Sequence, residues 1–168
     1  MNPMTATANL TLCQADYANP QHMQALLDLL DGYARDPMGG GEPLSEFVKS
    51  KLPQALTSRP FLFSVLAFDA SGLPVGLVNC VEGFSTFACQ PLVNVHDVVV
   101  LASHRGQRVG EQMLVLVAQI ARTRGACKLT LEVLEGNASA QKLYRRLGFE
   151  NYQLNPAMGQ ARFMQKWL

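Results

Sequence analysis

The stretch that decides the fold runs from Val95 to Leu116 and reads VHDVVVLASHRGQRVGEQMLVL. It begins with an apolar run typical of a buried strand and continues into a short loop, Arg105 to Gly110. Apolar residues at helical spacing follow directly. A helix N-terminus after a glycine-containing turn presents backbone N–H groups and the positive end of the helix dipole, which together favour an anion. The sequence therefore predicts a phosphate-binding site between this strand and this helix.

The flanking sequence predicts a mixed sheet with helices around it. Runs of β-branched and aromatic residues predict strands, helical spacing of apolar residues predicts helices, and glycine or proline marks their ends. The expected elements, in chain order, are strand 10–13, helix 20–35, helix 45–57, strands 61–68, 75–81 and 92–101, helix 109–124, strand 128–134, helix 138–147, and strands 149–154 and 161–168. The order β-α-α-β-β-β-α-β-α-β-β, with hairpins beside one strand-helix-strand crossover, predicts an α+β fold with a mostly antiparallel central sheet.

Composition limits the class of protein. A chain of 168 residues fits one domain, expected over residues 1–168 with a flexible tail at residues 1–9. Hydrophobic residues make up 48% and charged residues 16%, which excludes an intrinsically disordered chain. The net charge of +1 without a basic stripe excludes a dedicated nucleic-acid binder. No apolar run approaches the roughly 20 residues of a membrane span, and the first residues lack a signal-peptide pattern. We therefore expect a cytoplasmic protein with neither nucleic acid nor membrane as a partner.

The residues that most often bind metals show no metal-ligand spacing. The four cysteines form no Cys-x-x-Cys, and the three histidines are isolated from them and from one another. We expect no metal site, and we expect the cysteines to be reduced thiols that are mostly buried.

On its own, the loop from Arg105 to Gly110 permits several ligands. It lacks the Gly-Lys-Ser/Thr ending of a nucleotide P-loop. It also follows two hairpin strands instead of opening a βαβ unit, unlike the dinucleotide fingerprint. A purely structural turn and a site for another phosphate ligand both stay open at this point. A second motif narrows the choice: NASAQKLYRRLGF, from Asn137 to Phe149, begins 27 residues after Gly110.

With both motifs, the chain resembles the GNAT superfamily of acetyl-coenzyme A-dependent N-acetyltransferases. The family pattern Arg/Gln-x-x-Gly-x-Gly/Ala is matched at Arg105 and Gly110, and the later pattern Asn, Ala, Tyr, Gly-Phe at residues 137, 140, 144 and 148–149. The resemblance is specific across residues 93–149 and generic before residue 61. It departs at Arg108, where the family has a glycine that lets the backbone approach the pyrophosphate. An arginine there can bind a phosphate or point to solvent. The resemblance implies the GNAT fold and acetyl-CoA as cosubstrate.

The resemblance also implies which residues bind the cofactor. Pantetheine would hydrogen-bond to the main chain of the strand before the loop, where a backbone N–H would stabilise the oxyanion. Those residues are Val98, Val99 and Val100, and an ordinary buried strand explains the same valines. The pyrophosphate would lie on the loop and the helix start, at Arg105, Gly106, Arg108, Val109, Gly110 and Glu111. Asn137 would cap the later helix and contact the cofactor, although capping alone also explains it.

Acyl transfer to an amine needs a neutral amine, a polarised thioester and a protonated leaving thiolate. Tyr144 matches the family tyrosine that protonates the coenzyme A sulfur, and a core aromatic is the alternative. The candidate bases are His96, Glu82 and Glu132. Histidine side chains in general titrate near neutral pH, which suits a base. Asp97, next to His96 on a strand, is expected to face the opposite side of the sheet. A water chain without a single base remains open.

The resulting hypothesis is an enzyme in which a primary amine of a small molecule or peptide attacks acetyl-CoA directly, with Tyr144 as general acid. The acceptor is expected between a mobile loop from Met38 to Pro43 and an apolar loop carrying Phe84 and Phe87. A homodimer is compatible with the resemblance. The alternative is a non-catalytic acyl-CoA-binding or sensor module of the same fold.

Overall fold

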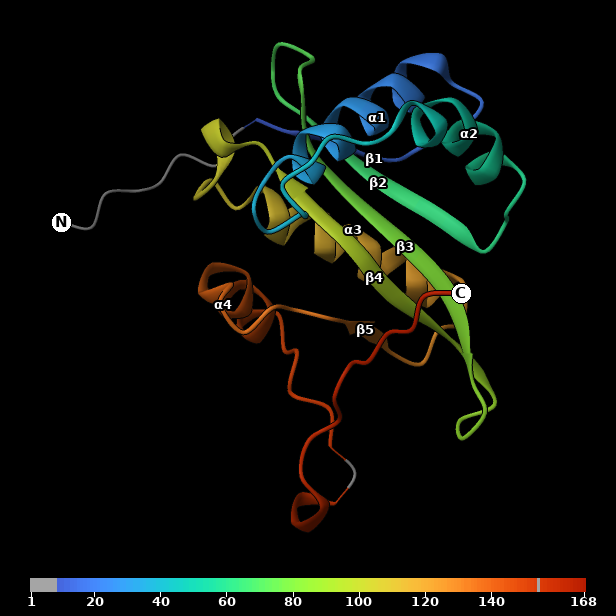
Figure 1. Ribbon diagram of the computed structural model, residues 1–168, viewed down its shortest axis with the longest axis vertical. Helices are drawn as coiled ribbons and strands as arrows, with labels where there is room; N and C mark the ends of the chain where they lie inside the picture. The colour runs from blue at the N-terminus through green and yellow to red at the C-terminus, as the bar shows by residue number, and fades with distance from the viewer. Residues whose placement is uncertain (1–8, 154) are drawn as a thin grey trace, which may run out of the picture. The chain divides into compact units, whose positions relative to one another are not determined.

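The computed structural model describes residues 9–153 and 155–168 (Figure 1). The tail expected at residues 1–9 lies, except for Asn9, outside the described residues. The chain forms two compact units, one ending at Leu131 and the other beginning at Glu132. No helix in the described part of the chain is long and apolar enough to cross a membrane.

The first unit is built on a five-stranded sheet. Its strands lie in chain order: β1 (Thr11–Gln14), β2 (Leu62–Phe68), β3 (Pro74–Ser85), β4 (Gln90–Val100) and β5 (Leu129–Leu131). The first four strands pair antiparallel, and β4 pairs with β5 in parallel. Two hairpins make the antiparallel neighbours, whereas a parallel pair needs a crossover, which a helix supplies. The predicted mixed, mostly antiparallel sheet is confirmed.

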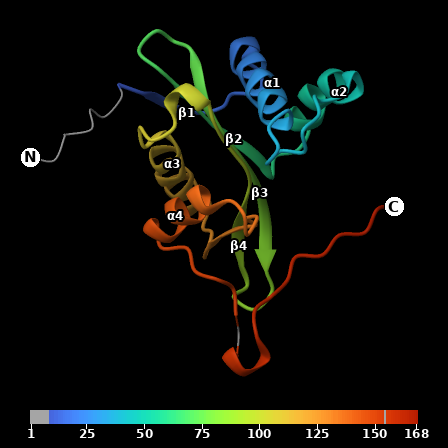
Figure 2. The ribbon, with the colours of Figure 1, turned by 60° about the vertical axis from the view of Figure 1, so that its left-hand side comes forward.

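Three helices cover the two faces of this sheet. They are α1 (Pro20–Ala34), α2 (Glu46–Thr57) and α3 (Val109–Thr123). Leu77 of β3 belongs to the core cluster that α1 forms with the sheet, whereas its neighbour Gly76 faces Met113 of α3. Because adjacent residues of a strand point to opposite faces, α1 and α3 lie on opposite sides of the sheet (Figure 2).

Local sequence signals explain where these helices begin. The Asn19 side chain caps α1 by accepting hydrogen bonds from the backbone N–H groups of Gln21 and His22. Ser45 caps α2 in the same way. α2 continues through Pro53 to Thr57, since a proline removes only one intrahelical hydrogen bond.

The β3–β4 hairpin is longer than predicted. Direct pairing continues from Glu82 opposite Val93 to Ser85 opposite Gln90, so the loop expected over residues 83–91 shrinks to residues 86–89. Phe84 and Phe87 are exposed, as expected.

The second unit contains the helix α4 (Ala138–Arg146) and a short 3-10 turn, η2 (Pro156–Met158). Its described residues form no strand where two closing strands were predicted, at 149–154 and 161–168, and β5 ends at Leu131 instead of residue 134. Apolar alternation alone does not make a strand, which exists only with a hydrogen-bonded neighbour. The apolar side chains of the last segment accordingly stay exposed: Phe163, Met164, Trp167 and Leu168.

Candidate functional site

The candidate site of the first unit begins where β4 loses one neighbour. β5 pairs with β4 from Val93 to Val95 and ends there, opposite Leu131. Beyond this point β3 is the only strand paired with β4 among the described residues. The segment from Val98 to Val100 therefore presents an open edge to which an extended molecule can add as a strand.

A β-bulge decides which backbone groups face this edge. Asp97 pairs with Asn79 and Val95 pairs with Cys80, so His96 is an extra residue between two rungs. The bulge follows from the register and interrupts the alternation on which the opposite orientation of His96 and Asp97 was predicted. The opposite orientation of these two side chains therefore stays a prediction.

Two backbone hydrogen bonds show that the bulge reverses the edge of β4 toward which odd-numbered residues point their N–H groups. Before the bulge the Val93 N–H donates to the Lys128 carbonyl oxygen at 3.1 Å, on the β5 side. After it the Leu101 N–H donates to the Val75 carbonyl oxygen at 2.9 Å, on the β3 side. Since hydrogen-bonding groups of alternate residues point to the same edge, Val98 and Val100 turn theirs to the open edge.

Val99 differs from its two neighbours. By the same alternation its backbone groups face β3, and its side chain is buried in the core beside α1. Of the three valines predicted to contact pantetheine through their backbone, the structure thus offers Val98 and Val100 for this contact.

The predicted loop and helix start follow β4. After a 3-10 turn, η1 (Ala102–His104), Gly106 has a φ of +79° and Arg108 a φ of +60°. The Gln112 N–H makes the first intrahelical hydrogen bond, to the Arg108 carbonyl oxygen. The preceding amides, at Val109, Gly110 and Glu111, start α3, where backbone N–H groups have no intrahelical acceptor. This arrangement can bind an anion such as a phosphate group.

Arg108 is the N-cap of α3 and occupies the left-handed region with φ +60° and ψ +20°. Its side chain makes no capping hydrogen bond, is 64% exposed, and lies 3.9 Å from the Glu111 carboxylate. The backbone at this position is therefore the one that the family glycine would allow, although the side chain is an arginine.

Arg105 connects the end of β4 to the turn after α1. Its Nε donates to the Val100 carbonyl oxygen at 3.2 Å, and its Nη2 lies 3.3 Å from Asp36 Oδ2. The Met38 backbone N–H and the Arg105 guanidinium hold the pKa of the Asp36 carboxyl below its usual range. In this structure the Arg105 side chain is thus engaged by protein groups.

The turn after α1 is anchored by hydrogen bonds, whereas a mobile loop was predicted there. The N–H groups of Gly39 and Gly41 donate to the Asp36 carbonyl oxygen at 2.8 Å and 3.1 Å. The Tyr33 hydroxyl donates to the Met38 carbonyl oxygen at 3.3 Å. The glycines form a tight turn here, and the mobility of this loop stays a prediction.

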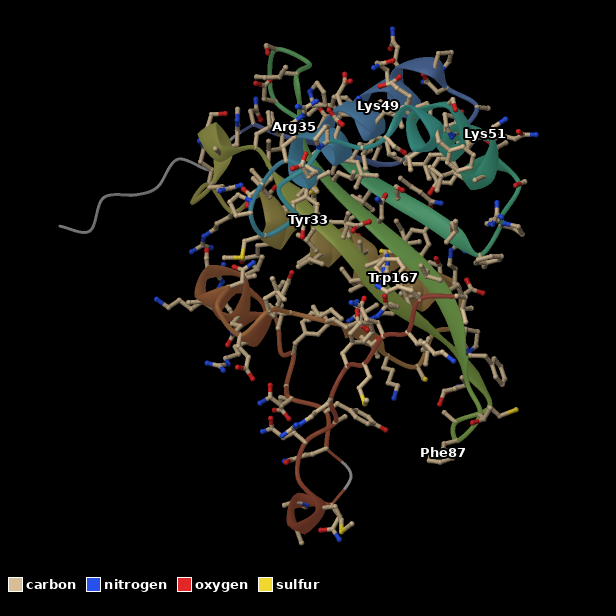
Figure 3. All side chains as sticks on the ribbon, in the orientation of Figure 1. Tyr33, Arg35, Lys49, Lys51, Phe87 and Trp167 are labelled. Atoms are coloured by element: carbon tan, nitrogen blue, oxygen red, sulfur yellow. The ribbon has the colours of Figure 1, made fainter. Side chains whose placement is uncertain are left out.

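The two loops predicted to enclose the acceptor lie at opposite ends of the sheet. The turn after α1 is joined through Arg105 to the Val100 end of β4, and the hairpin carrying Phe87 is at the Gln90 end. Ten residues of strand separate these ends by roughly 30 Å. Figure 3 shows the labelled Tyr33 and Phe87 correspondingly far apart. The predicted position of the acceptor between these loops is therefore wrong.

The candidate bases have different surroundings. Glu82 forms an ion pair of 3.0 Å with Arg124 of α3, whose guanidinium lies 4.5 Å above the Phe63 ring. Glu82 therefore has a structural partner on the face opposite α1. His96 is exposed at the bulge, and Glu132 is exposed just beyond the end of β5 instead of within a strand.

Asp97, which was expected only to face away from His96, is a further functional candidate. It lies on the α1 face, where Asn79 Nδ2 donates to its Oδ2 at 3.0 Å. Burial, with Asp97 and Asp36 nearby, raises the pKa of the Tyr33 hydroxyl on α1. The available signal was a carboxylate in a run of valines, because a charge in an apolar strand must be paired or solvated.

In the second unit, Asn137 caps α4 by accepting a hydrogen bond from the Ala140 N–H at 3.1 Å. Tyr144 is buried on this helix and packs edge-on against Phe149, with ring centroids 5.8 Å apart. Gly148 has a φ of +86°, as expected for a glycine that ends a helix. The Asn-Tyr-Gly-Phe motif thus forms one compact helix and its end.

The four cysteines are free thiols, and only Cys80 is buried. The prediction that most of them are buried is wrong, since Cys89 lies in the hairpin turn and Cys127 in the connection to β5, both exposed. Within the described residues, no three His, Cys, Asp or Glu side chains gather as a metal site would require.

Comparison with known proteins agrees with this geometry. The family model described as Acetyltransferase (GNAT) family matches residues 23–149. The streptothricin acetyltransferase of Streptomyces lavendulae is 40% identical over 90 residues, which cover 52% of this chain and 48% of that protein. The thialysine N-epsilon-acetyltransferase of Bos taurus is 30% identical over 100 residues, covering 55% and 58% of the two chains. The chain thus spans about half the length of the curated relatives it matches.

Solved structures share the fold. A probable acetyltransferase has a TM-score of 0.78 at 21% identity, covering 94% of this chain and 98% of its own. An aminoglycoside N-acetyltransferase in complex with CoA has a TM-score of 0.71 at 19% identity, covering 95% of each chain.

Proposed function

The chain belongs to the Acetyltransferase (GNAT) family, and we propose from this that it transfers an acetyl group from acetyl-CoA to a primary amine. The observation that carries the proposal is the open edge of β4, which leads directly into the N-terminus of α3. One part suits the amides of pantetheine, and the other suits a pyrophosphate.

The chain's own backbone would supply most of the cofactor contacts. Val98 and Val100 would pair with the pantetheine arm, and an N–H of this edge would stabilise the oxyanion formed when the amine attacks the thioester carbonyl. The amides at the start of α3 would bind the pyrophosphate. Arg105 would act indirectly, because its guanidinium already joins Val100 to Asp36.

For the proton transfers we propose Tyr144 as the general acid that protonates the leaving thiolate. The match of residues 137–149 to the family motif supports this role, as does the ordered helix that carries the tyrosine. On the acceptor side, Asp97 and His96 are the candidates closest to the open edge, with Glu132 after β5 as a further one. Asp97 is the group we propose to bind the ammonium of the acceptor.

The proposed acceptor is a small molecule with at least one cationic amine. Two relatives are named for thialysine and streptothricin, so these compounds are the first to test. A peptide N-terminus and an aminoglycoside complete the panel.

The experiment measures release of free thiol from acetyl-CoA with each amine, for the wild type and Tyr144→Phe. Removal of a general acid costs about 10²–10⁴-fold in rate, so we expect at least a hundredfold lower kcat with unchanged coenzyme A binding. An undiminished kcat in Tyr144→Phe would reject the general-acid role. Coenzyme A binding by calorimetry without thiol release from any amine would favour the non-catalytic module. Binding of a nucleotide without pantetheine, but not of acetyl-CoA, would reject both.

A further inference from the structure

A polar rung borders the apolar core on the α1 face of the sheet. Ser64 of β2 lies directly opposite Asn79 of β3, which lies directly opposite Asp97 of β4. The next rung on the same face is apolar and buried, and consists of Leu66, Leu77 and Val99. The change from an apolar to a polar rung coincides with the bulge and with the beginning of the open edge.

The hydrogen bonds along this rung run in one direction. Ser64 Oγ donates to Asn79 Oδ1 at 2.7 Å, and Asn79 Nδ2 donates to Asp97 Oδ2 at 3.0 Å. Because the single Ser64 proton is used for Asn79, the Tyr17 hydroxyl at 2.8 Å must donate to Ser64 Oγ. The opposite orientation of the Asn79 amide would place its oxygen against a carboxylate. The chain of donors from Tyr17 therefore ends on Asp97.

An apolar rung would stabilise the fold at least as well as this series of hydrogen-bonded side chains. Ser64 is completely buried, and a buried hydroxyl costs free energy that its hydrogen bonds only offset. Apolar side chains of similar volume, like those of the next rung, would fill the same space at no such cost. What the polar chain adds is a fixed amide orientation and hence a fixed carboxylate.

We infer that Asn79, Ser64 and Tyr17 are positioning residues that orient the Asp97 carboxylate toward the ammonium group of the acceptor. The inference deepens the proposed function and rests on it only in identifying the cation as the acceptor. Asn79 donates to one carboxylate oxygen and, as a neutral amide, adds no positive charge to the site. A cation is therefore attracted to this site, and a neutral molecule of the same shape is not.

The test uses the full chain with coenzyme A bound and n-butylammonium as the probe, with 1-butanol as its neutral counterpart. The side-chain amide signals of Asn79 in NMR spectra report directly on its hydrogen bond to Asp97. We expect n-butylammonium to shift these signals and 1-butanol to leave them in place. Asp97→Asn should abolish the shift.

The positioning role is tested by Ser64→Ala, with Cys80→Ala as the matched control. Each variant removes one heavy atom from a buried residue, and Cys80 lies on the opposite face of the sheet. Loss of one hydrogen bond is worth about 1 kcal/mol, so we expect Ser64→Ala to weaken binding of n-butylammonium about fivefold and Cys80→Ala less than about twofold. Tyr17→Phe, which removes only a hydroxyl, gives a second reading if Ser64→Ala fails to fold.

Two outcomes would overturn the inference: unshifted Asn79 signals on addition of n-butylammonium, or equal affinities in wild type, Ser64→Ala and Tyr17→Phe. Failure of the proposed function looks different. If the probe shifts Asn79 but no amine releases thiol from acetyl-CoA, the inference stands and the activity does not. If thiol is released while the probe leaves the Asn79 signals unshifted, the activity stands and the inference is wrong.

Discussion

The most direct test of the loop geometry is to replace Arg108 by glycine and by alanine and to compare the two variants. With φ +60° and ψ +20°, residue 108 is left-handed, which costs a residue with a Cβ about 1–2 kcal/mol and glycine nothing. Both variants lose the exposed contact with Glu111, worth a few tenths of a kcal/mol at about 3.9 Å. Glycine also makes the unfolded chain more flexible, which offsets about 0.4–1 kcal/mol of its advantage.

The balance predicts that Arg108→Gly is more stable than Arg108→Ala by about 1 kcal/mol, or roughly 3 °C in Tm for a chain of this size. Thermal or urea unfolding measures this difference. Two alanine substitutions at glycines serve as controls of opposite sign. Gly125 has a φ of +76°, so Gly125→Ala should destabilise. A Cβ added at Gly32 meets no described atom within 4 Å, so Gly32→Ala should stabilise α1 by about 1 kcal/mol. If Arg108→Ala were as stable as Arg108→Gly, residue 108 would not be left-handed and the glycine-like role of its backbone would be refuted.

Three further predictions concern the turn after α1 and the buried thiol. A Cβ at Gly39 would overlap the Tyr33 carbonyl oxygen, so Gly39→Ala should lower the free energy of unfolding by about 1–3 kcal/mol; a wild-type urea midpoint would contradict the tight turn. Burial raises the pKa of the Cys80 thiol to about 12, so a thiol reagent at pH 8 should modify exposed Cys89 and Cys127 promptly and Cys80 only after unfolding. Between pH 9 and pH 12 the unfolded chain loses a Cys80 proton that the native state keeps, so wild-type stability should fall across this range and fall less in Cys80→Ala.

Much of the fold could be predicted because local signals and tertiary structure agree. Asn19-Pro20 begins α1 with a satisfied cap, and the apolar spacing after Val109 gives a helix whose buried face meets the sheet. The mostly antiparallel sheet follows from two hairpins and one crossover. The prediction of two closing strands failed because the signal it used is local. Alternation of apolar residues is a local property, whereas strand pairing depends on a neighbour that the local sequence does not specify.

The secondary structure around the proposed site was predicted, but its register and its side-chain partners were not. The strand, loop and helix from Val95 onward lie where the motif placed them, because glycine and helix signals in the loop are local. The bulge at His96 was missed, since it appears only in the register between β3 and β4. The partners of Glu82 and Asp97 were missed as well, because Arg124 and Asn79 come from distant parts of the chain. A charged residue in an apolar strand indicates that a partner exists, but the local sequence does not identify that partner.

The extra residue at His96 is one that β4 can lose without losing a pair. Val95 and Asp97 lie opposite consecutive residues of β3, Cys80 and Asn79, so removing His96 would leave a regular ladder. Asp97 would still lie opposite Asn79, and Val98 and Val100 would still face the open edge. In a scan by single-residue deletion, position 96 is therefore expected to be tolerant, because its loss removes a bulge and no pairing.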